Sequence, residues 1–181
     1  MRRTINTIVI DDNHNASFQR VTAHRNAVSG LTMEGVPEYK AREILLKALT
    51  GINACGFKTP DFGIKITISN HGENPDILTA PIAVAILVLS RQIKPVTELE
   101  NIIIAGDLKL NGELKECYTF DAGSPVSWPE SKTQFMTDHT RMHIMPKDTD
   151  LNLKMTEKGP FTVEALDLKT IQDILECNIR D

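Results

Sequence analysis

The chain has 181 residues, a length that suits one domain. Hydrophobic residues make up 41% and charged residues 24%, which is ordinary for a globular protein. The net charge of −4 gives no overall electrostatic footprint for nucleic acid. The longest apolar run, Ala80 to Leu89, is about half the length of a membrane span, and the first residues do not form a signal peptide. We therefore expect a single soluble domain, 1–181, in the cytoplasm.

The three cysteines, Cys55, Cys117 and Cys177, are an odd number and lie far apart in the chain. This pattern predicts neither a disulfide framework nor a zinc motif, and reduced thiols fit a cytoplasmic protein. No motif for a cofactor or a metal is present, and we predict none.

The first third of the chain predicts two strands and a helix. Thr7 to Ile10 is a short β-branched run and indicates a strand, whereas Asp12 to Arg25 is polar and is expected to be irregular. Leu31 to Glu34 indicates a second strand. From Pro37 to Gly56, apolar residues recur on one helical face, which predicts an amphipathic helix.

The middle of the chain predicts a buried helix between strands. Ile64 to Ser69 alternates as a strand does. Thr79 is predicted to cap a helix from Pro81 to about Gln92. This helix is apolar on all sides, so we expect it to lie at the centre of the fold. Two further strands are expected, Ile102 to Ala105 and Leu108 to Leu110.

The C-terminal part predicts a loop followed by two strands and a helix. Asn111-Gly112 is typical of a hairpin turn. Asp121 to Lys132 is rich in proline and serine and predicts a loop, part of a divergent excursion over 121–141. The last elements expected are strands at Met142 to Met145 and Phe161 to Ala165 and a helix at Leu168 to Cys177. Strands and helices are mixed along the chain, so the sequence predicts an α/β (α+β) fold with a mostly buried helix on a sheet, and an N-terminal strand and polar loop over 1–30.

Several blocks resemble a known family when they are taken in order. Gly35 to Phe57 (GVPEYKAREILLKALTGINACGF) is similar to a block with Gly-Leu-Pro, a charged helix and a Ser-Gly-Phe-type ending. Pro81 to Ile93 (PIAVAILVLSRQI) is similar to a buried helix that begins Leu-Pro-Ile-Ala, and Gly106 to Leu114 (GDLKLNGEL) to a Gly-Glu-Leu-x-Leu-x-Gly block. The ending FTVEALDLKTIQDIL is similar to a closing strand and helix. These blocks resemble the Lon-protease-like N-terminal domain of the magnesium-chelatase-like/ComM family.

The resemblance covers about Leu31 to Leu175 and implies a βαβ fold with a buried central helix on a mixed sheet. The same fold occurs in Lon protease and in the C-terminal domain of the recombination factor RadA. Lon uses a serine nucleophile activated by a lysine, which needs a neutral amine. The serine position falls at Ile77 here, whose neighbours Asp76 and Leu78 also lack a hydroxyl, and the lysine position falls near Asp121.

A phosphate-binding Gly-x-x-x-x-Gly-Lys-Ser/Thr loop, which begins the ATPase module of the family, is also missing from the sequence. The resemblance therefore implies a non-catalytic module that self-associates, works with an AAA+ ATPase on another chain, or contacts nucleic acid. The alternative is a hydrolase (peptidase) with a relocated nucleophile, Thr79 or Ser69, and Lys109 or Lys115 as its base.

The remaining candidates are contact residues. Lys40, Arg42 and Lys47 lie near one another on the first helix among glutamates, and favour either a solvated face or a subunit interface or phosphate contact. Trp128, the only tryptophan, is either a binding anchor or packed on the sheet.

Two weaker patterns could concern metals. His139 and His143 are four residues apart, as zinc ligands on a helix can be, but we interpret them as surface residues. The polar run Asp11 to Asn15 could offer oxygen ligands to a hard cation, although a solvated loop explains it as well.

Overall fold

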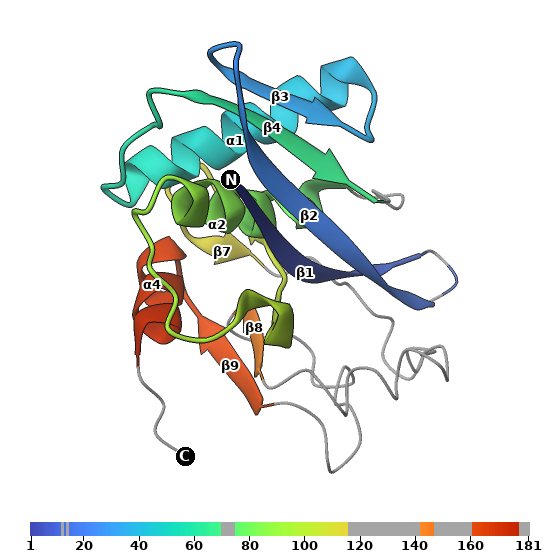
Figure 1. The fold of residues 1–181 in the computed structure, drawn as a ribbon. Coiled ribbons are helices and arrows are strands. Elements are labelled where there is room, and N and C mark those ends of the chain that lie inside the picture. The colour runs from blue at the N-terminus through green and yellow to red at the C-terminus, as the bar shows by residue number, and fades with distance from the viewer. Residues whose placement is uncertain (12, 14, 70–74, 116–141, 147–160, 178–181) are drawn as a thin grey trace.

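The computed structural model describes residues 1–11, 13, 15–69, 75–115, 142–146 and 161–177. Within these residues, the main sheet has seven strands (Figure 1). Their order is β3 (Leu31–Glu34), β4 (Gly63–Ile68), β2 (Ala16–Asn26), β1 (Arg2–Ile10), β5 (Ile102–Ile104), β8 (Met142–Pro146) and β9 (Phe161–Ala165). β2 is antiparallel to both of its neighbours, and the other pairs are parallel.

Three α-helices are formed by the described residues: α1 (Glu38–Ala54), α2 (Thr79–Leu89) and α4 (Leu168–Glu176). α2 packs against β1, β2 and α1, and α1 also packs against β3 (Figure 1). Every residue of α2 is buried, which confirms the prediction of a central apolar helix. The predicted mixed α/β fold is likewise confirmed. None of the helices in the described part of the chain has the length and apolar content that a membrane crossing needs.

The largest error of the sequence prediction concerns β2. Asp12 to Arg25 was expected to be irregular, yet Ala16–Asn26 is a long strand paired with β1 and β4. Val21 and Ala23 are buried, whereas of the alternate residues Arg20 is exposed and Thr22 and His24 are partly exposed. A strand with one solvated face needs only a few small apolar residues inward, so polar residues dominate its sequence.

The other bounds differ less. β1 begins at Arg2 rather than Thr7, and α2 ends at Leu89 rather than Gln92. The strands predicted at Leu31, Ile64, Ile102, Met142 and Phe161 and the last helix are confirmed. Asp121, Trp128 and His139 lie outside the described residues.

A short hairpin, β6 (Asp107–Leu108) with β7 (Leu114–Lys115), packs on α1. Its turn contains Asn111-Gly112 as predicted, and Gly112 adopts a φ of +87°, which favours glycine. The strand predicted to reach Leu110 ends at Leu108, because the chain enters the turn there: the Lys109 N–H donates to the Glu113 carbonyl at 2.8 Å. This hairpin brings Asp107 to the start of α2.

Candidate functional site

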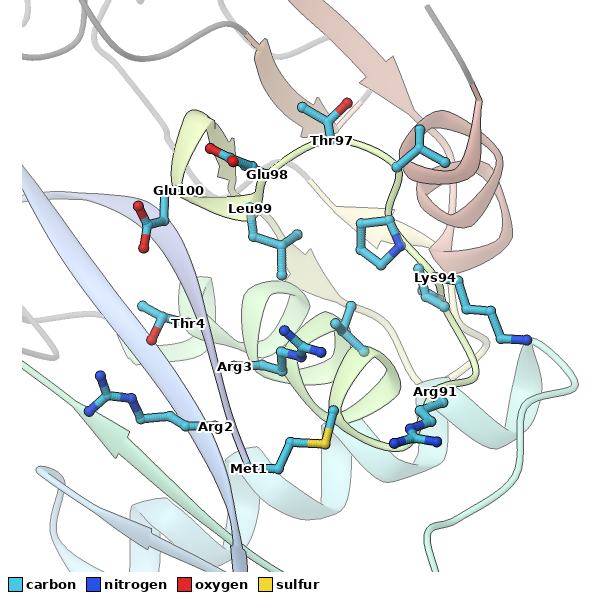
Figure 2. Close-up of a pocket in the computed structure, with 14 residues that line it drawn as sticks. Met1, Arg2, Arg3, Thr4, Arg91, Lys94, Thr97, Glu98, Leu99 and Glu100 are labelled. Atoms are coloured by element: carbon cyan, nitrogen blue, oxygen red, sulfur yellow. The ribbon is translucent and has the colours of Figure 1, made fainter.

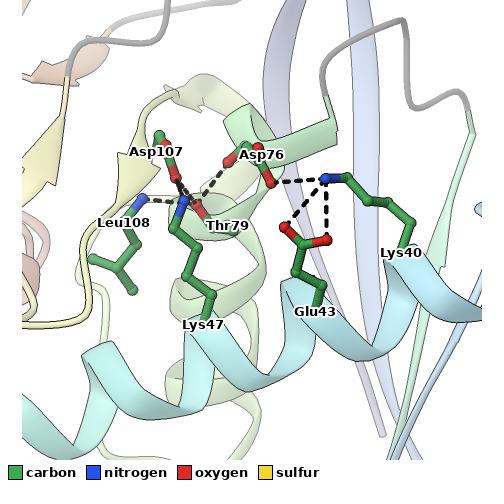
Figure 3. A network of polar contacts seen from close by, with 7 residues as sticks. All are labelled: Lys40, Glu43, Lys47, Asp76, Thr79, Asp107 and Leu108. Carbon is green, nitrogen blue, oxygen red and sulfur yellow. Dashed lines mark hydrogen bonds and ion pairs between the residues drawn. The ribbon is translucent and has the colours of Figure 1, made fainter.

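The start of α2 carries a cluster of polar side chains that is sheltered from solvent (Figure 3). The Thr79 side chain is fully buried. Its hydroxyl oxygen accepts a hydrogen bond from the Leu108 N–H at 2.7 Å. The hydroxyl lies 2.7 Å from the Asp76 carbonyl oxygen and 3.1 Å from Oδ1 of Asp107, the two acceptors for its single hydrogen. The hydroxyl therefore joins α2 to β6 and to the turn before the helix.

Asp107 connects this hydroxyl to a lysine of α1. The Lys47 Nζ lies 2.5 Å from Oδ1 of Asp107, and the two side chains are 23% and 13% exposed. We name Lys47, Thr79 and Asp107 the Thr79 cluster. Three segments that are distant in the chain thus place an amine, a carboxylate and a hydroxyl in contact.

A second lysine of α1 adjoins the Thr79 cluster. The Lys40 Nζ lies 3.3 Å from Glu43 and 3.6 Å from Asp76, a residue of the short 3-10 turn η1 (Pro75–Leu78). Desolvation lowers the pKa of Lys40, but its hydrogen bond to Glu43 and the charge of Asp76 outweigh this effect and raise the pKa overall. Lys40 therefore acts as a cation that ties α1 to the turn before α2.

The structure changes the assignment of Thr79. The prediction that Thr79 caps the helix is wrong: the helix begins at Thr79 itself, after Leu78, and no side-chain cap bond forms. The reason is that η1 runs directly into α2, while the Thr79 hydroxyl is used by the backbone of β6.

The lysine of the Thr79 cluster is Lys47, and neither lysine that the sequence suggested as a base belongs to the cluster. Lys109 pairs with Glu113 at 3.5 Å on the surface, and Lys115 is exposed. The sequence contained one signal for this arrangement: Lys40 and Lys47 are seven residues apart and share a side of α1. The spacing of Lys40 and Lys47 does not reveal which polar residues they contact, because these contacts depend on tertiary packing.

The other candidate nucleophile, Ser69, is exposed at the end of β4. Its hydroxyl donates to Oε1 of Gln19 at 2.6 Å and accepts from the Arg20 N–H at 3.2 Å. These bonds attach the end of β4 to β2.

His143 is placed differently from our expectation. It lies on strand β8, 2% exposed, so its interpretation as a surface residue is wrong. Desolvation by burial lowers its pKa to about 4. Within the described residues its Nε2 has no hydrogen-bond partner, and a neutral imidazole fits this environment.

The polar run after β1 closes a turn. Oδ1 of Asp11 accepts from the N–H groups of Asn13 and Asn15, each at 2.9 Å, as in a local side-chain-to-backbone turn. Asp12 and His14 lie outside the described residues. In the part of the chain that the structure describes, no group of three or more His, Cys, Asp or Glu side chains is placed to hold a metal ion.

The outer side of α1 differs from the side that faces the Thr79 cluster. Arg42 is highly exposed and pairs with Glu38 at 2.5 Å. Tyr39 and Leu46, seven residues apart, are 75% and 67% exposed. We name Tyr39, Arg42 and Leu46 the outer α1 face; of the three basic candidates, Arg42 alone belongs to it, while Lys40 and Lys47 point toward η1 and β6.

No protein-family model matches this chain, and no curated protein is significantly similar to it in sequence.

Proposed function

We propose that this chain is a Lon-like domain that acts as a non-catalytic assembly module in the cytoplasm. It self-associates and holds a partner, either an AAA+ ATPase on a separate chain or nucleic acid. The observation that carries the proposal is the state of the Thr79 hydroxyl, which is fully buried and hydrogen-bonded to the amide of Leu108. A nucleophile must reach its substrate, and this oxygen is instead part of the packing between α2 and β6.

The electrostatics of the cluster support the same proposal. A lysine that activates a hydroxyl must offer a neutral amine. Lys47 instead forms a close ion pair with Asp107, in which the amine serves as a charged ammonium. Lys47 thus fastens α1 to the hairpin.

The outer α1 face is the surface that we assign to self-association. Two large apolar side chains, Tyr39 and Leu46, are exposed there beside Arg42 and its partner Glu38. An apolar pair flanked by both signs of charge is suited to a two-fold contact, in which the same surface of each copy meets the other. A tyrosine and an arginine at the centre of such a contact are typical anchors.

The test is the mass in solution, measured by light scattering over a concentration series. We expect a discrete oligomer for the wild type and a monomer for the double variant Tyr39→Glu/Leu46→Glu. Val28→Glu is the matched control, because Val28 is also 67% exposed but lies in the turn between β2 and β3. A wild-type chain that stays monomeric at every concentration would contradict self-association.

One observation favours a second function, a hydrolase that uses Thr79 as its nucleophile. The hydroxyl, Asp107 and Lys47 are in contact, and a nucleophile next to an acid–base pair is the usual arrangement of such enzymes. Covalent labelling by a fluorophosphonate probe decides between the functions. Labelling that is lost in Thr79→Ala and retained in Ser69→Ala would establish the hydrolase and reject the non-catalytic module.

A further inference from the structure

A hollow of about 880 Å³ lies between the start of β1 and the segment that follows α2 (Figure 2). Its volume falls in the range of small-molecule sites, roughly 300–1,000 Å³. The residues that surround it belong to 1–4, to the end of α2, and to 91 and 93–100. It is on a different part of the molecule from the Thr79 cluster, whose residues do not contribute to it.

The segment that follows α2 is held in place by hydrogen bonds to two elements, β1 and α4. The Asn6 side chain donates to the Glu100 carbonyl oxygen at 3.0 Å, which holds the segment on β1. The Val96 N–H donates to the Leu175 carbonyl oxygen at 3.0 Å, and the Lys94 N–H to Glu176 at 2.8 Å, so α4 supports the other side. Both β1 and α4 therefore support the walls of the hollow.

One side of the hollow is cationic. Arg3 extends from β1 toward the space above α2, and Arg91 and Lys94 come from the segment after α2, at the rim (Figure 2). Arg2, also at the wall, points to the other side of β1 (Figure 2). None of these four side chains forms an ion pair within the described residues, although the protein carries a net charge of −4. The end of the α2 dipole favours nearby cations, but it does not explain Arg3, which belongs to another element.

Arg91 has an unusual backbone conformation as well. Its φ is +60°, the left-handed region, and it directly follows the last turn of α2, a position that glycine usually occupies. Strained residues of this kind concentrate at functional sites. At this position an arginine replaces the usual glycine, and its guanidinium lies at the rim of the hollow.

The opposite side of the hollow is acidic. Glu98 and Glu100 lie there, and Leu99 lies between them and Arg3 (Figure 2). A strand of nucleic acid, with a phosphate on every nucleotide, would meet these carboxylates. A small ligand with its phosphates at one end and hydrogen-bond donors at the other matches both sides.

We propose that this hollow binds a phosphorylated small molecule of nucleotide size. Its phosphates contact Arg3, Arg91 and Lys94, because guanidinium groups match phosphate oxygens in geometry and charge. Its hydroxyl or amino groups donate to Glu98 and Glu100, and its less polar part covers Leu99. The site is independent of the assembly function and of the Thr79 cluster.

Isothermal titration calorimetry with ATP, in the absence of divalent metal, tests the proposal. We expect saturable binding of ATP that weakens as salt is added. The affinity should fall by about tenfold or more in Arg3→Gln, because this variant removes a charge-assisted hydrogen bond to phosphate. Arg91→Gly should lose a similar factor while relieving the backbone strain, so its loss of affinity cannot be attributed to a failure to fold. Lys58→Gln, which removes an exposed cation away from the hollow, should bind as the wild type does.

Three outcomes would overturn the proposal. They are no binding at millimolar ATP, an equal loss of affinity in Lys58→Gln, and tighter binding of a thymidine oligonucleotide than of ATP. Inorganic tripolyphosphate is the remaining probe: weaker binding than ATP is expected, and equal affinity would reject the role of Glu98 and Glu100.

Discussion

Lys47 of α1 and Asp107 of β6 form a close ion pair that joins the first helix to the hairpin, with Nζ and Oδ1 2.5 Å apart. Asp107 also lies 3.1 Å from the Thr79 hydroxyl, so one carboxylate links three elements. Both members of the pair are mostly sheltered from water. Removing one charge would leave the other without its partner in a site that hydrates it poorly.

Asp107→Asn should therefore lower the free energy of unfolding by about 1–3 kcal/mol, because it leaves the Lys47 ammonium unpaired. Urea denaturation measures this loss. Glu113→Gln is the matched control: it breaks the pair with Lys109, whose members are about half exposed, and should cost less than about 1 kcal/mol. Equal losses in the two variants would contradict the importance that we give to Asp107.

Substitutions of Thr79 separate its hydroxyl from its shape. Thr79→Val keeps the shape but leaves the Leu108 N–H without an acceptor in a buried site, at a cost of about 1–3 kcal/mol. Thr79→Ser keeps the hydroxyl and should be the more stable of the two. Thermal and urea unfolding measure both. A valine variant as stable as the serine variant would show that the bond to Leu108 contributes little.

Gly51 provides a test of how closely the hairpin approaches α1. A Cβ at Gly51 would overlap the side chain of Leu108, with Cγ only 2.7 Å away. We expect Gly51→Ala to destabilise the protein by about 1–3 kcal/mol, although alanine favours a helix over glycine by about 1 kcal/mol. Thr50→Ala, the neighbouring and partly exposed position, is the control and should be nearly neutral. A stabilised Gly51→Ala variant would mean that the hairpin moves away freely.

The sequence predicted the elements whose apolar residues form a clear pattern. α2 is apolar on all sides because it is buried on all sides, and α1 has the pattern of one buried face. β2 was missed because most of its residues are polar and its fully buried apolar residues, Val21 and Ala23, are few and small. A strand is recognised from the difference in polarity between its inward and outward residues. This difference is small in a strand that has one solvated face and few large apolar residues.

The Thr79 cluster was predicted only in part for a related reason. Thr79 was singled out from its place before the apolar run, but its partners come from α1 and from β6. Lys47 and Lys109 look equivalent in the sequence. Only the packing of the hairpin on α1 decides that Lys47 meets Asp107 while Lys109 remains on the surface with Glu113. Such long-range choices do not follow from local spacing.

The last prediction concerns pH and rests on His143. Burial lowers its pKa to about 4, whereas an unfolded histidine titrates near 6.5. Below about pH 6.5 the unfolded chain therefore takes up a proton that the folded chain refuses, so stability is lost as the pH falls from about 6.5 to about 4. The difference between these two pKa values corresponds to about 3 kcal/mol of stability over this window.

Urea denaturation of the wild type and of His143→Leu, at several pH values from 8 to 4, isolates this contribution from that of the carboxylates. Leucine suits the site because the His143 Nε2 has no hydrogen-bond partner within the described residues. We expect the stability of the wild type relative to the leucine variant to fall as the medium becomes acidic. His24→Gln controls for the loss of a histidine as such, since His24 is only partly buried on β2. Parallel stability curves for the wild type and His143→Leu would show that His143 is protonated as readily in the folded chain as in the unfolded one.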